Sequence, residues 1–462
     1  MNMPLSADLG SLRVCLPELR ILHLKLKNGT NDLYYSKKRG VMAMLIEFSF
    51  ENYKSFKEKA VLDLSAAKMS KFADRVILSG NERLLPAAAI YGANASGKSN
   101  VYSAFAYMTE YVIDSFQYGG EEEHFKAVRP APFLFADETE NADTGFEVYF
   151  TIPDDKPERV FHYGFSIGNE GVTEEWLNSK VSTAKDFTKV FYRDSDVLDL
   201  EGLPKNCREN IKVALEPQVL IVSLGAKLKV DQCIQIRDWF MQNGFADYDS
   251  LTAGFKIQNR LPKGFAEDPA VRADVVKYIA SFDETIKGFR VEKVSSETGM
   301  GHEDPYQIST IHRKINSDKM VEIPLEEESA GTLKMLALYT ELQKVLKNGG
   351  VYFVDGLDSR LHPLLVRNLI VTFLNPEVNT KHAQLIFTTH DTWLLSSKLL
   401  RRDEIWFTEK DENGVSALYS LADFVEEGKS EACPVENYEV GYLSGKYGAI
   451  PSLKGMICNG QG

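Results

Sequence analysis

One eight-residue run constrains the fold more than any other feature of the sequence. It reads Gly-Ala-Asn-Ala-Ser-Gly-Lys-Ser, spans Gly92–Ser99 and satisfies the pattern G-x-x-x-x-G-K-[ST]. An apolar stretch at 85–91 precedes it, and a stretch with helical periodicity at 100–116 follows it. A strand that leads into a glycine-rich turn and then a helix is the setting in which this pattern binds phosphate. The run therefore predicts a phosphate-binding loop within an α/β fold.

The residue types in this loop suit a nucleoside triphosphate. Small residues let backbone N–H groups point inward at phosphate oxygens, and the N-terminus of the helix adds partial positive charge. Lys98 is expected to neutralise the β- and γ-phosphates, and the Ser99 hydroxyl is expected to take one Mg²⁺ position. The predicted cofactor-binding residues of the loop are Gly92, Ala93, Asn94, Ala95, Ser96, Gly97, Lys98 and Ser99.

A second segment has the properties of a Walker B strand. Val351–Val354 are four consecutive apolar residues, and Asp355 follows them. Burial of the apolar side chains would hold Asp355 at the carboxyl end of a strand, where it can orient Mg²⁺ through water. Many buried strands end in aspartate, so the segment becomes informative only together with the phosphate loop. We predict Ser99 and Asp355 as the metal site, and Lys98 and Asp355 as catalytic residues.

Further motifs resemble the ABC/SMC superfamily of ATPases. Asn94 lies within the loop and Asn100 just after it, Glu328–Thr332 precedes the Walker B segment, and Thr388-Thr389-His390 follows it. The resemblance implies an ABC-type nucleotide-binding domain, ATPase activity, and ATP and Mg²⁺ as cofactors. It also adds Asn100 to the predicted cofactor-binding residues.

Three other motifs resemble, more narrowly, the stand-alone bacterial AAA/ABC-like ATPases related to the OLD and RloA-type proteins. They are Phe50–Phe56 (FENYKSF), Leu361-His362-Pro363 and the C-terminal Tyr447–Pro451. Several members of that group belong to anti-phage systems, including the ATPase component of PARIS. The resemblance covers roughly residues 44–455, and it implies a role in anti-phage defence.

By this resemblance, Ser329 and Gly331 form a signature loop that contacts the γ-phosphate held by a second subunit. A hydroxyl and a bare backbone N–H at the start of a helix over 332–346 would suit an anion. Two composite sites then form across an isologous dimer, in which ATP joins the two halves. His390 corresponds to the switch histidine that senses the γ-phosphate, and Asp358 lies in the loop that crosses the dimer interface. Both are predicted as catalytic residues.

The residue after the Walker B aspartate departs from the pattern of the superfamily. That position usually holds a glutamate that polarises the attacking water, and here it is Gly356. Loss of a general base commonly lowers a rate by about 10²- to 10⁴-fold. One interpretation is slow hydrolysis with long retention of ATP. The other is that hydrolysis is supported elsewhere, with Asp358 or Asp391 as candidate substitutes.

Composition and charge narrow the class of protein. Hydrophobic residues make up 44% and charged residues 26% of the 462 residues, which is ordinary for a soluble globular chain. The formal net charge of -13 argues against a surface that grips nucleic acid over its whole extent, but it allows a local basic groove. The five cysteines never fall in a C-x-x-C pair, which indicates reduced thiols. Without a signal peptide or an apolar run of the ~20 residues that span a membrane, we expect a cytoplasmic protein with no membrane partner.

The order of predicted elements indicates an α/β fold, namely an ABC-type P-loop nucleotide-binding domain with an antiparallel β subdomain near 133–195 and a helical insertion. Strands are expected at 45–51, 60–64, 85–91, 145–152, 160–167, 171–182, 188–192, 351–354, 383–388, 404–409 and 416–421. Helices are expected at 100–116, 232–243, 269–282 and 326–346.

The same patterns divide the chain into four parts. Residues 1–43, with a basic cluster at 34–39, are expected to be a poorly ordered leader or a mis-assigned start, and the alternative is a nucleic-acid-binding arm. Residues 44–204 would form the N-terminal half of the ATPase domain with its β subdomain, 205–300 a mostly helical insertion, and 301–462 the C-terminal half with the signature, Walker B segment and switch histidine.

Several other features are expected to be structural. The charge runs Glu326–Glu328 and Arg401–Glu404 indicate solvated surface. A group of aromatic residues is expected in the core of the β subdomain rather than in a base-stacking platform. They are Phe133, Phe135, Phe146, Tyr149 and Phe150.

Two functions from different classes follow. The first is a regulatory ATPase that assembles as a homodimer or higher homo-oligomer through an ATP sandwich and controls a separately encoded effector, for which a nuclease is favoured. Residues 400–462 are too few for a Toprim-type nuclease, and the trigger would be DNA or a phage protein. The second is a DNA-repair or chromosome-associated ATPase of the SMC/RecF kind that binds DNA directly, which requires a contiguous Lys/Arg groove.

Overall fold

The computed structural model describes residues 43–119, 125, 128–152, 158–247, 261–293, 306–424 and 437–451. The predicted leader lies outside the described residues except for Ala43. No helix in these ranges is both long enough and apolar enough to cross a membrane.

A six-stranded sheet carries the predicted phosphate loop. Its strand order is β11-β15-β16-β5-β17-β18, and neighbouring strands are parallel except for β17 and β18. Parallel strands need crossover connections, which place helices on the faces of the sheet. The strands are β5 (Ala87–Gly92), β11 (Gly244–Asp247), β15 (Val351–Asp355), β16 (Gln384–Thr388), β17 (Ile405–Lys410) and β18 (Ser416–Ser420).

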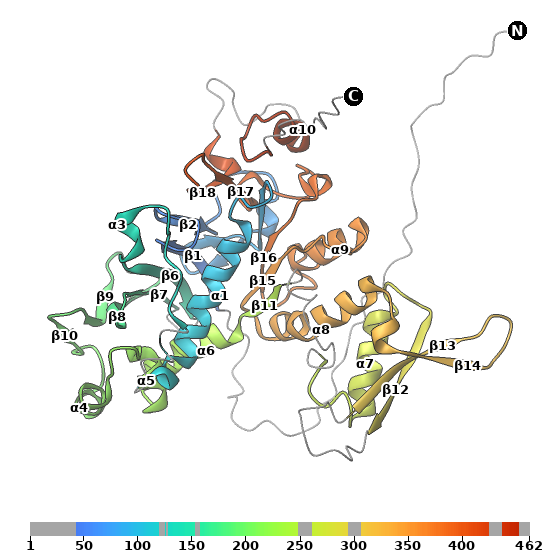
Figure 1. Ribbon diagram of the computed structural model, residues 1–462, viewed down its shortest axis with the longest axis horizontal. Helices are drawn as coiled ribbons and strands as arrows, with labels where there is room; N and C mark the ends of the chain where they lie inside the picture. The colour runs from blue at the N-terminus through green and yellow to red at the C-terminus, as the bar shows by residue number, and fades with distance from the viewer. Residues whose placement is uncertain are drawn as a thin grey trace, which may run out of the picture.

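Both faces of this sheet are buried. Helix α1 (Lys98–Asp114) packs on one face, and α8 (Ala330–Asn348) and α9 (Pro363–Leu374) pack on the other (Figure 1). In β5, Ala88 and Ile90 point to the α1 side, and the alternate residues point to the α8 side. Because a strand buried on both faces is apolar at every position, the uninterrupted apolar run before the loop is explained.

A seven-stranded antiparallel sheet lies on the far side of α1. Its order is β10-β9-β8-β7-β6-β1-β2, and the predicted antiparallel meander, β6 to β9, is confirmed. The sheet extends beyond the predicted limits of 133–195, because β1 and β2 from the start of the described chain complete one edge. The strands are β1 (Met44–Glu51), β2 (Ala60–Asp63), β6 (Thr144–Ile152), β7 (Arg159–Ile167), β8 (Val172–Val181), β9 (Thr188–Arg193) and β10 (Leu198–Asp199).

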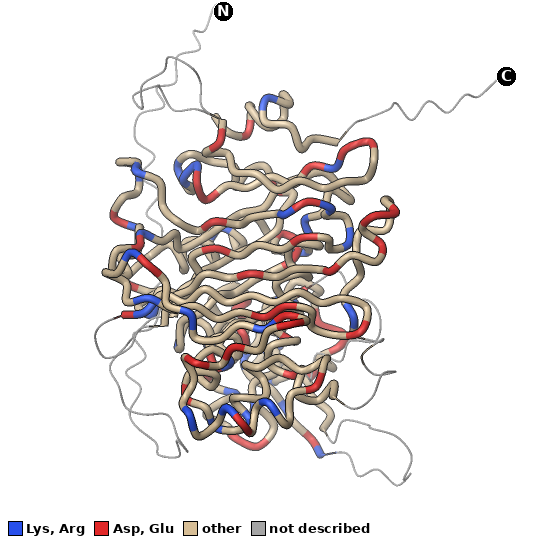
Figure 2. The backbone as a smooth tube through the Cα atoms, turned by 90° about the vertical axis from the view of Figure 1, so that its left-hand side faces the viewer, with Lys and Arg blue, Asp and Glu red and all other residues tan. Residues whose placement is uncertain are grey.

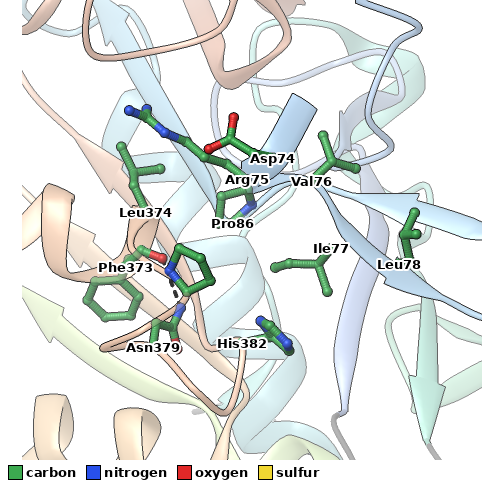
Figure 3. Close-up of a pocket in the computed structure, with 11 residues that line it drawn as sticks. Asp74, Arg75, Val76, Ile77, Leu78, Pro86, Phe373, Leu374, Asn379 and His382 are labelled. Carbon is green, nitrogen blue, oxygen red and sulfur yellow. Dashed lines mark hydrogen bonds between the residues drawn. The ribbon is translucent and has the colours of Figure 1, made fainter. Parts of the chain in front are cut away.

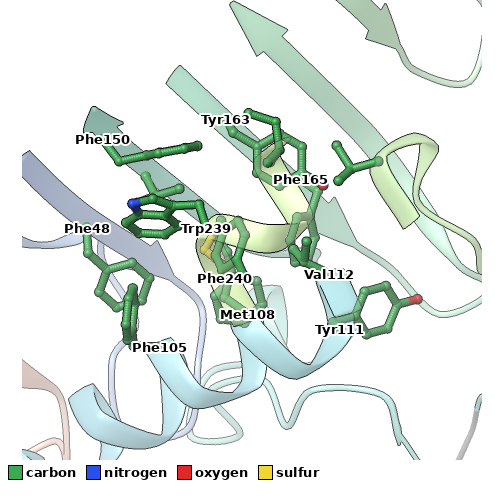
Figure 4. Packing of buried hydrophobic residues seen from close by; sticks show 14 of the residues in the cluster. Phe48, Phe105, Met108, Tyr111, Val112, Phe150, Tyr163, Phe165, Trp239 and Phe240 are labelled. Carbon is green, nitrogen blue, oxygen red and sulfur yellow. The ribbon is translucent and has the colours of Figure 1, made fainter. Parts of the chain in front are cut away.

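Aromatic side chains fill the space between this sheet and the helices beneath it (Figure 4). Phe48 of β1 meets Phe105 of α1 edge to face, with ring centroids 5.0 Å apart. Phe150 of β6 stacks on Trp239 of α6 (Asp231–Gln242) at 4.2 Å. Large aromatic rings bury much apolar surface, so this core joins the antiparallel sheet to the helix that follows the phosphate loop.

The described part of residues 205–300 contains strands as well as helices. The predicted helices are confirmed as α6 and α7 (Pro269–Ile279), and α4 (Lys205–Ala214) and α5 (Ile221–Lys227) precede them. Two strands were not predicted. The short β11 joins the edge of the parallel sheet beside β15, and β12 (Ile286–Lys293) forms a small antiparallel sheet with β13 (Tyr306–Arg313) and β14 (Met320–Pro324). A four-residue strand carries too little periodicity to be recognised from sequence.

Short elements complete the described chain. Tyr442 of α10 (Tyr438–Leu443) stacks on Phe407 of β17 with centroids 5.5 Å apart, which holds the C-terminal segment against the parallel sheet. The others are β3 (Ile77–Ser79), β4 (Glu82–Leu84), α3 (Asp137–Glu140), and the 3₁₀ turns η1 (Ala73–Arg75), η2 (Ser115–Tyr118), η5 (Leu325–Glu327), η6 (Thr392–Leu394), η7 (Arg402–Glu404) and η8 (Leu421–Asp423).

The prediction of a surface turn at Arg401–Glu404 is wrong. Arg401, Asp403 and Glu404 are buried. The Arg401 guanidinium donates to both carboxylate oxygens of Asp403, at 2.9 and 2.7 Å, and to the carbonyl oxygens of Ala67 and Lys71. The network fixes the segment 67–71 against the start of β17. A run of charged letters does not reveal this, because the carbonyl partners come from the other end of the chain.

The predicted aromatic core is confirmed except at one position. Phe133, Phe146 and Phe150 are buried and Tyr149 is half-buried, whereas Phe135 is 75% exposed. Phe135 meets Phe133 edge to face, with centroids 5.5 Å apart, so it lies over the core rather than within it.

Replacing Arg401 with Met should destabilise the fold. The substitution leaves the buried Asp403 carboxylate without its cation, and breaking one partner out of a buried pair costs about 3–5 kcal/mol. We expect the free energy of unfolding, measured by urea denaturation, to fall by that amount. Lys398→Met is the control, because Lys398 is exposed and should change stability by less than about 0.5 kcal/mol. Equal stability of the two variants would contradict the importance of the network.

Candidate nucleotide-binding site

The predicted site residues gather at one edge of the parallel sheet. Strand β5 ends at Gly92, β15 at Asp355 and β16 at Thr388. On the other side of β5, Thr408 of β17 pairs with Gly92. Because the carboxyl ends of parallel strands meet at the same edge, loops from different parts of the sequence come together there.

The phosphate loop is closed by its own lysine. Lys98 Nζ donates to the carbonyl oxygens of Gly92 and Ala93, each at 2.9 Å. Burial lowers the pKa of Lys98 to about 8, and the nearby carboxylates of Asp355 and Asp358 oppose that shift. The ammonium group therefore lies at the loop, partly desolvated and close to two acidic side chains.

Packing behind the loop fixes its shape. Gly97 has φ 115°, a left-handed conformation, and a Cβ there would lie 2.8 Å from Ser416 Oγ. The hydroxyls of Ser96 and Thr408 are hydrogen-bonded at 2.6 Å. Asn100 Nδ2 donates to Ser55 Oγ at 2.7 Å, which joins α1 to the turn after β1. The side chains of Ser96 and Asn100 thus anchor the loop, while Asn94, Ala95 and Ser99 are exposed.

Asp355 is held in place by the next strand. Thr388 Oγ1 donates to Asp355 Oδ1 at 2.5 Å and accepts the N–H of Gly356 at 2.7 Å. Asp355 is buried. Among the described residues no group of three or more His, Cys, Asp or Glu side chains could hold a metal ion. A carboxylate held in this way suits Mg²⁺, which is usually bound by one or two protein carboxylates together with waters and substrate phosphates.

A buried lysine shapes the loop after Asp355. Lys334 of α8 donates to the carbonyl oxygens of Gly356, Leu357 and Ser359, at 2.9, 3.1 and 2.6 Å. Lys334 is only 2% exposed. Drawing three nearby carbonyls toward one ammonium group requires a tight turn, and Gly356 accordingly has φ 64°. A side chain at that φ costs roughly 1–2 kcal/mol, which gives a physical reason for glycine at position 356.

Asp358 and His390 are neighbours within one chain. The backbone N–H of His390 lies 3.4 Å from Asp358 Oδ2. The other oxygen, Asp358 Oδ1, is buried and has no hydrogen-bond partner in the described part of the chain. The His390 residue is exposed at the end of the loop after β16. The two predicted catalytic residues therefore lie on adjoining loops at the carboxyl edge.

The signature residues form the N-terminus of α8. Ser329 is the N-cap, and its Oγ accepts the N–H of Thr332 at 3.1 Å. Ser329 is exposed and Gly331 is half-buried. In the described ranges no hydrogen bond or ion pair joins either residue to the phosphate loop.

Glu328 is not solvated, contrary to prediction. Its Oε1 lies 2.8 Å from His312 Nε2 and also accepts a hydrogen bond from Thr310 Oγ1, both on β13. Its side chain is 8% exposed. The small sheet of the 205–324 region thus holds the residue that precedes the signature serine. The sequence gives no sign of these hydrogen-bond partners of Glu328, because the strand that carries them, β13, was not predicted.

Sequence reasoning missed three other residues at this edge. Asp247 ends β11 and pairs in register with Asp355, but its strand was not recognised. Lys334 shares a helical stripe with the buried Leu338, Leu342 and Val345, and a charge on an apolar stripe was the available signal. Thr388 was noted only as part of a motif.

A small pocket of about 110 Å³ lies away from this edge (Figure 3). Its lining includes Pro86, just before β5, and His382, just before β16. Both positions mark the amino ends of parallel strands. The pocket therefore lies at the amino edge of the parallel sheet, away from the phosphate loop and Asp355 at the carboxyl edge.

A comparison with protein families identifies the chain. The family described as "AAA domain, putative AbiEii toxin, Type IV TA system" matches residues 87–396. The chain belongs to this AAA-domain family. The match runs from the first residue of β5 to the region of η6, so it includes the phosphate loop, the signature residues, Asp355 and His390. No curated protein matches the chain.

Solved structures also show similarity. The chain is 15% identical to the SmcHead bound to the C-winged helix domain of ScpA (TM-score 0.38), covering 81% of this chain and 97% of that chain. It is 16% identical to the SMC head domain from Thermotoga maritima (TM-score 0.36), covering 83% and 99%. It is 12% identical to the recombination mediator protein RecF-ATP in the RecFOR pathway (TM-score 0.33), covering 83% and 100%.

The AAA-domain family implies ATP and, usually, Mg²⁺, and the residues present fit both. The loop offers backbone N–H groups at the N-terminus of the 17-residue α1, with Lys98 beside it. Ser99 presents an exposed hydroxyl, and Asp355 presents a carboxylate positioned by Thr388. A nucleoside triphosphate would supply the negative charge that Lys98 is placed to meet.

Replacing Lys334 with Met should loosen the loop after Asp355. The variant removes one ammonium donor from three carbonyl oxygens, and hydrogen bonds to a charged group are worth about 1.5–3 kcal/mol. We expect the free energy of unfolding, measured by urea denaturation, to fall by about 1.5–3 kcal/mol or more. Lys347→Met is the matched control on the same helix, because Lys347 is exposed near its C-terminus and should cost only about 0.3–1 kcal/mol. A smaller loss for Lys334→Met than for the control would refute this account.

Proposed function

We propose that this AAA-domain chain is an ATP-hydrolysing switch that assembles as a homodimer through two shared nucleotide sites. In each site, the phosphate loop of one subunit holds the triphosphate and the signature turn of the partner closes over it. The observation that carries the proposal is the exposed N-terminus of α8, where Ser329 caps the helix. Ser329 and Gly331 lie at an open helix N-terminus with no bond to the phosphate loop among the described residues.

The proposed roles follow from the chemistry of each group. Lys98 neutralises the β- and γ-phosphates, and Ser99 and Asp355 hold Mg²⁺. Ser329 and the Gly331 N–H bind the γ-phosphate from the partner, because a hydroxyl and a backbone N–H at the start of a 19-residue helix form an anion site. His390 reports on the γ-phosphate. ATP thereby makes different contacts in the separate and assembled states, as a switch requires.

A separately encoded effector, with a nuclease as the favoured class, is the proposed target of the switch in anti-phage defence. The support is the resemblance of the motifs to stand-alone defence ATPases, together with the description of the matched family as "AAA domain, putative AbiEii toxin, Type IV TA system". Direct DNA binding is the other function considered. On the face turned to the viewer in Figure 2, basic and acidic positions are interspersed along the strands, which does not favour it.

Shared sites can be tested by mixing two inactive variants. Lys98→Ala removes the phosphate-loop cation, and losing a charge-assisted contact should weaken ATP binding about 10- to 100-fold. Ser329→Asp keeps an N-cap residue but places a negative charge opposite the γ-phosphate. Each variant alone should lack phosphate release. An equal mixture forms half mixed dimers with one intact site of two, so it should recover about a quarter of wild-type activity.

Ser329→Asn is the control for the cap, since it keeps the hydrogen bond without the charge. It should retain more activity than Ser329→Asp. Two results would contradict the proposal. One is a mixture that recovers no phosphate release, and the other is an ATP affinity that Lys98→Ala leaves unchanged. Phosphate release in single-turnover experiments is the readout, because it measures hydrolysis under either interpretation of Gly356.

The effector can be sought with the same variants. We expect a protein to copurify with the wild type in an ATP-dependent manner and to be lost with Lys98→Ala. DNA-stimulated phosphate release that falls steeply with salt, without such a partner, would instead support the DNA-binding function.

A further inference from the structure

The backbone just before α8 takes its position from outside that helix. Ser329 is the N-cap, with φ -58° and ψ 144°, so its backbone is not helical. Its Oγ accepts the N–H of Thr332, but the hydrogen bonds within α8 do not fix the residues that precede the cap. The direction in which Ser329 faces therefore depends on how the residue before it, Glu328, is held.

Glu328 is held by β13 rather than by its own helix. His312 Nε2 lies 2.8 Å from Glu328 Oε1, and Thr310 Oγ1 donates to the same oxygen. Because an ionised carboxylate can only accept, His312 is the donor in this contact. The pair is largely shielded from water, since 14% of the His312 side chain and 8% of the Glu328 side chain are exposed.

The strand that provides these contacts is itself firmly placed. Thr310 is fully buried and pairs in register with Ile323 of β14. Ile308 of β13 belongs to the same buried cluster as Leu325, three residues before Glu328. The small sheet β12–β14 and the turn that leads into α8 are therefore parts of one packed unit.

A hydrogen-bonded contact specifies a position more closely than apolar packing would. An apolar side chain at 328 could fill the same space, and burying a carboxylate is unfavourable unless it is paired. Hydrogen bonds depend on direction as well as distance, so two donors on β13 fix where the Glu328 carboxylate lies. The residue fixed in this way adjoins Ser329, which is exposed and carries the hydroxyl of the proposed shared site.

We propose that His312 is a positioning residue for the signature turn. By holding Glu328, it fixes the direction in which Ser329 and the Gly331 N–H face the nucleotide of the partner subunit. The small sheet thereby controls assembly of the shared site without contacting the nucleotide. This inference rests on the proposed function, because the direction of Ser329 matters only where a second subunit meets it.

His312→Leu removes the contact and keeps a side chain of similar size. We expect ATP-dependent dimerisation and single-turnover phosphate release to fall by about 10- to 100-fold, because misplacing a group by about 1 Å can lower a rate about 10²-fold. ATP affinity at a protein concentration too low for dimerisation depends on the phosphate loop alone, and it should stay within about threefold of wild type. His312→Gln, whose amide can donate to Glu328, should recover part of the loss.

Two further variants separate this role from a general loss of folding. Glu328→Ala removes the same contact from its other end and leaves no buried carboxylate behind. Combined with His312→Leu, it should lower phosphate release no further than either single variant, because both remove one interaction. Arg290→Met is the matched control on the same small sheet. It breaks an exposed ion pair with Glu322 and should leave assembly and phosphate release within about threefold of wild type.

Mixing variants locates the defect in one half of the site. In a mixed dimer of His312→Leu with Lys98→Ala, the intact phosphate loop of the first chain meets the intact signature turn of the second. That mixture should recover to about a quarter of wild-type activity. The mixture of His312→Leu with Ser329→Asp should not recover, because both chains then carry an altered signature turn.

Several results would overturn the assignment. These are recovery in the mixture with Ser329→Asp, a loss of ATP affinity that accounts for the lost rate, or no rescue by His312→Gln. A loss smaller than about threefold in both His312→Leu and Glu328→Ala would also do so, as would an equal loss in Arg290→Met.

The mixture of Lys98→Ala with Ser329→Asp is the reference in the same assay. If this mixture does not recover, the proposed function itself is wrong. If it recovers while the mixtures that contain His312→Leu show the opposite pattern, only the role of His312 is wrong.

Discussion

The site depends on one constraint, the burial of both faces of the parallel strands. Since apolar side chains occupy both faces of β5, β15 and β16, the polar groups of these segments can lie only where the strands end. Parallel pairing brings those ends to one edge. Gly92, Asp355 and Thr388 are neighbours there although their positions in the chain are far apart. The antiparallel sheet and α6 pack on the side of α1 that faces away from the parallel sheet, and this packing fixes the helix that begins at Lys98.

Much of this core could be predicted from the sequence because its signals are local. The pattern Gly92–Ser99 carries its own context of strand and helix, and Val351–Asp355 is an apolar strand with a terminal carboxylate. In the segment from β6 to β9, strand-like runs are separated by short turns, which is a strong signal for antiparallel strands. In each case the residues that determine the element lie within or beside it.

The remainder depends on contacts between distant segments. The charge run that contains Glu328 indicates solvated surface, yet His312 and Thr310 of β13 contact this side chain. The run that contains Arg401 indicates the same, yet Arg401 donates hydrogen bonds to the carbonyl oxygens of Ala67 and Lys71. Burial of a charge is stable only when its partners are present, and the partners are not adjacent in sequence. The strand β11 was missed for a related reason, because a four-residue strand acquires its identity from pairing with β15.

Lys334 makes the signature helix and the loop after Asp355 parts of one rigid piece. Three hydrogen bonds from a buried ammonium group cannot be kept if either element shifts alone. In the dimer that we propose, any shift of Ser329 would therefore be accompanied by a shift of the loop 356–359, which follows Asp355 of the same chain. Each subunit would thus pass a displacement at one shared site directly to the other.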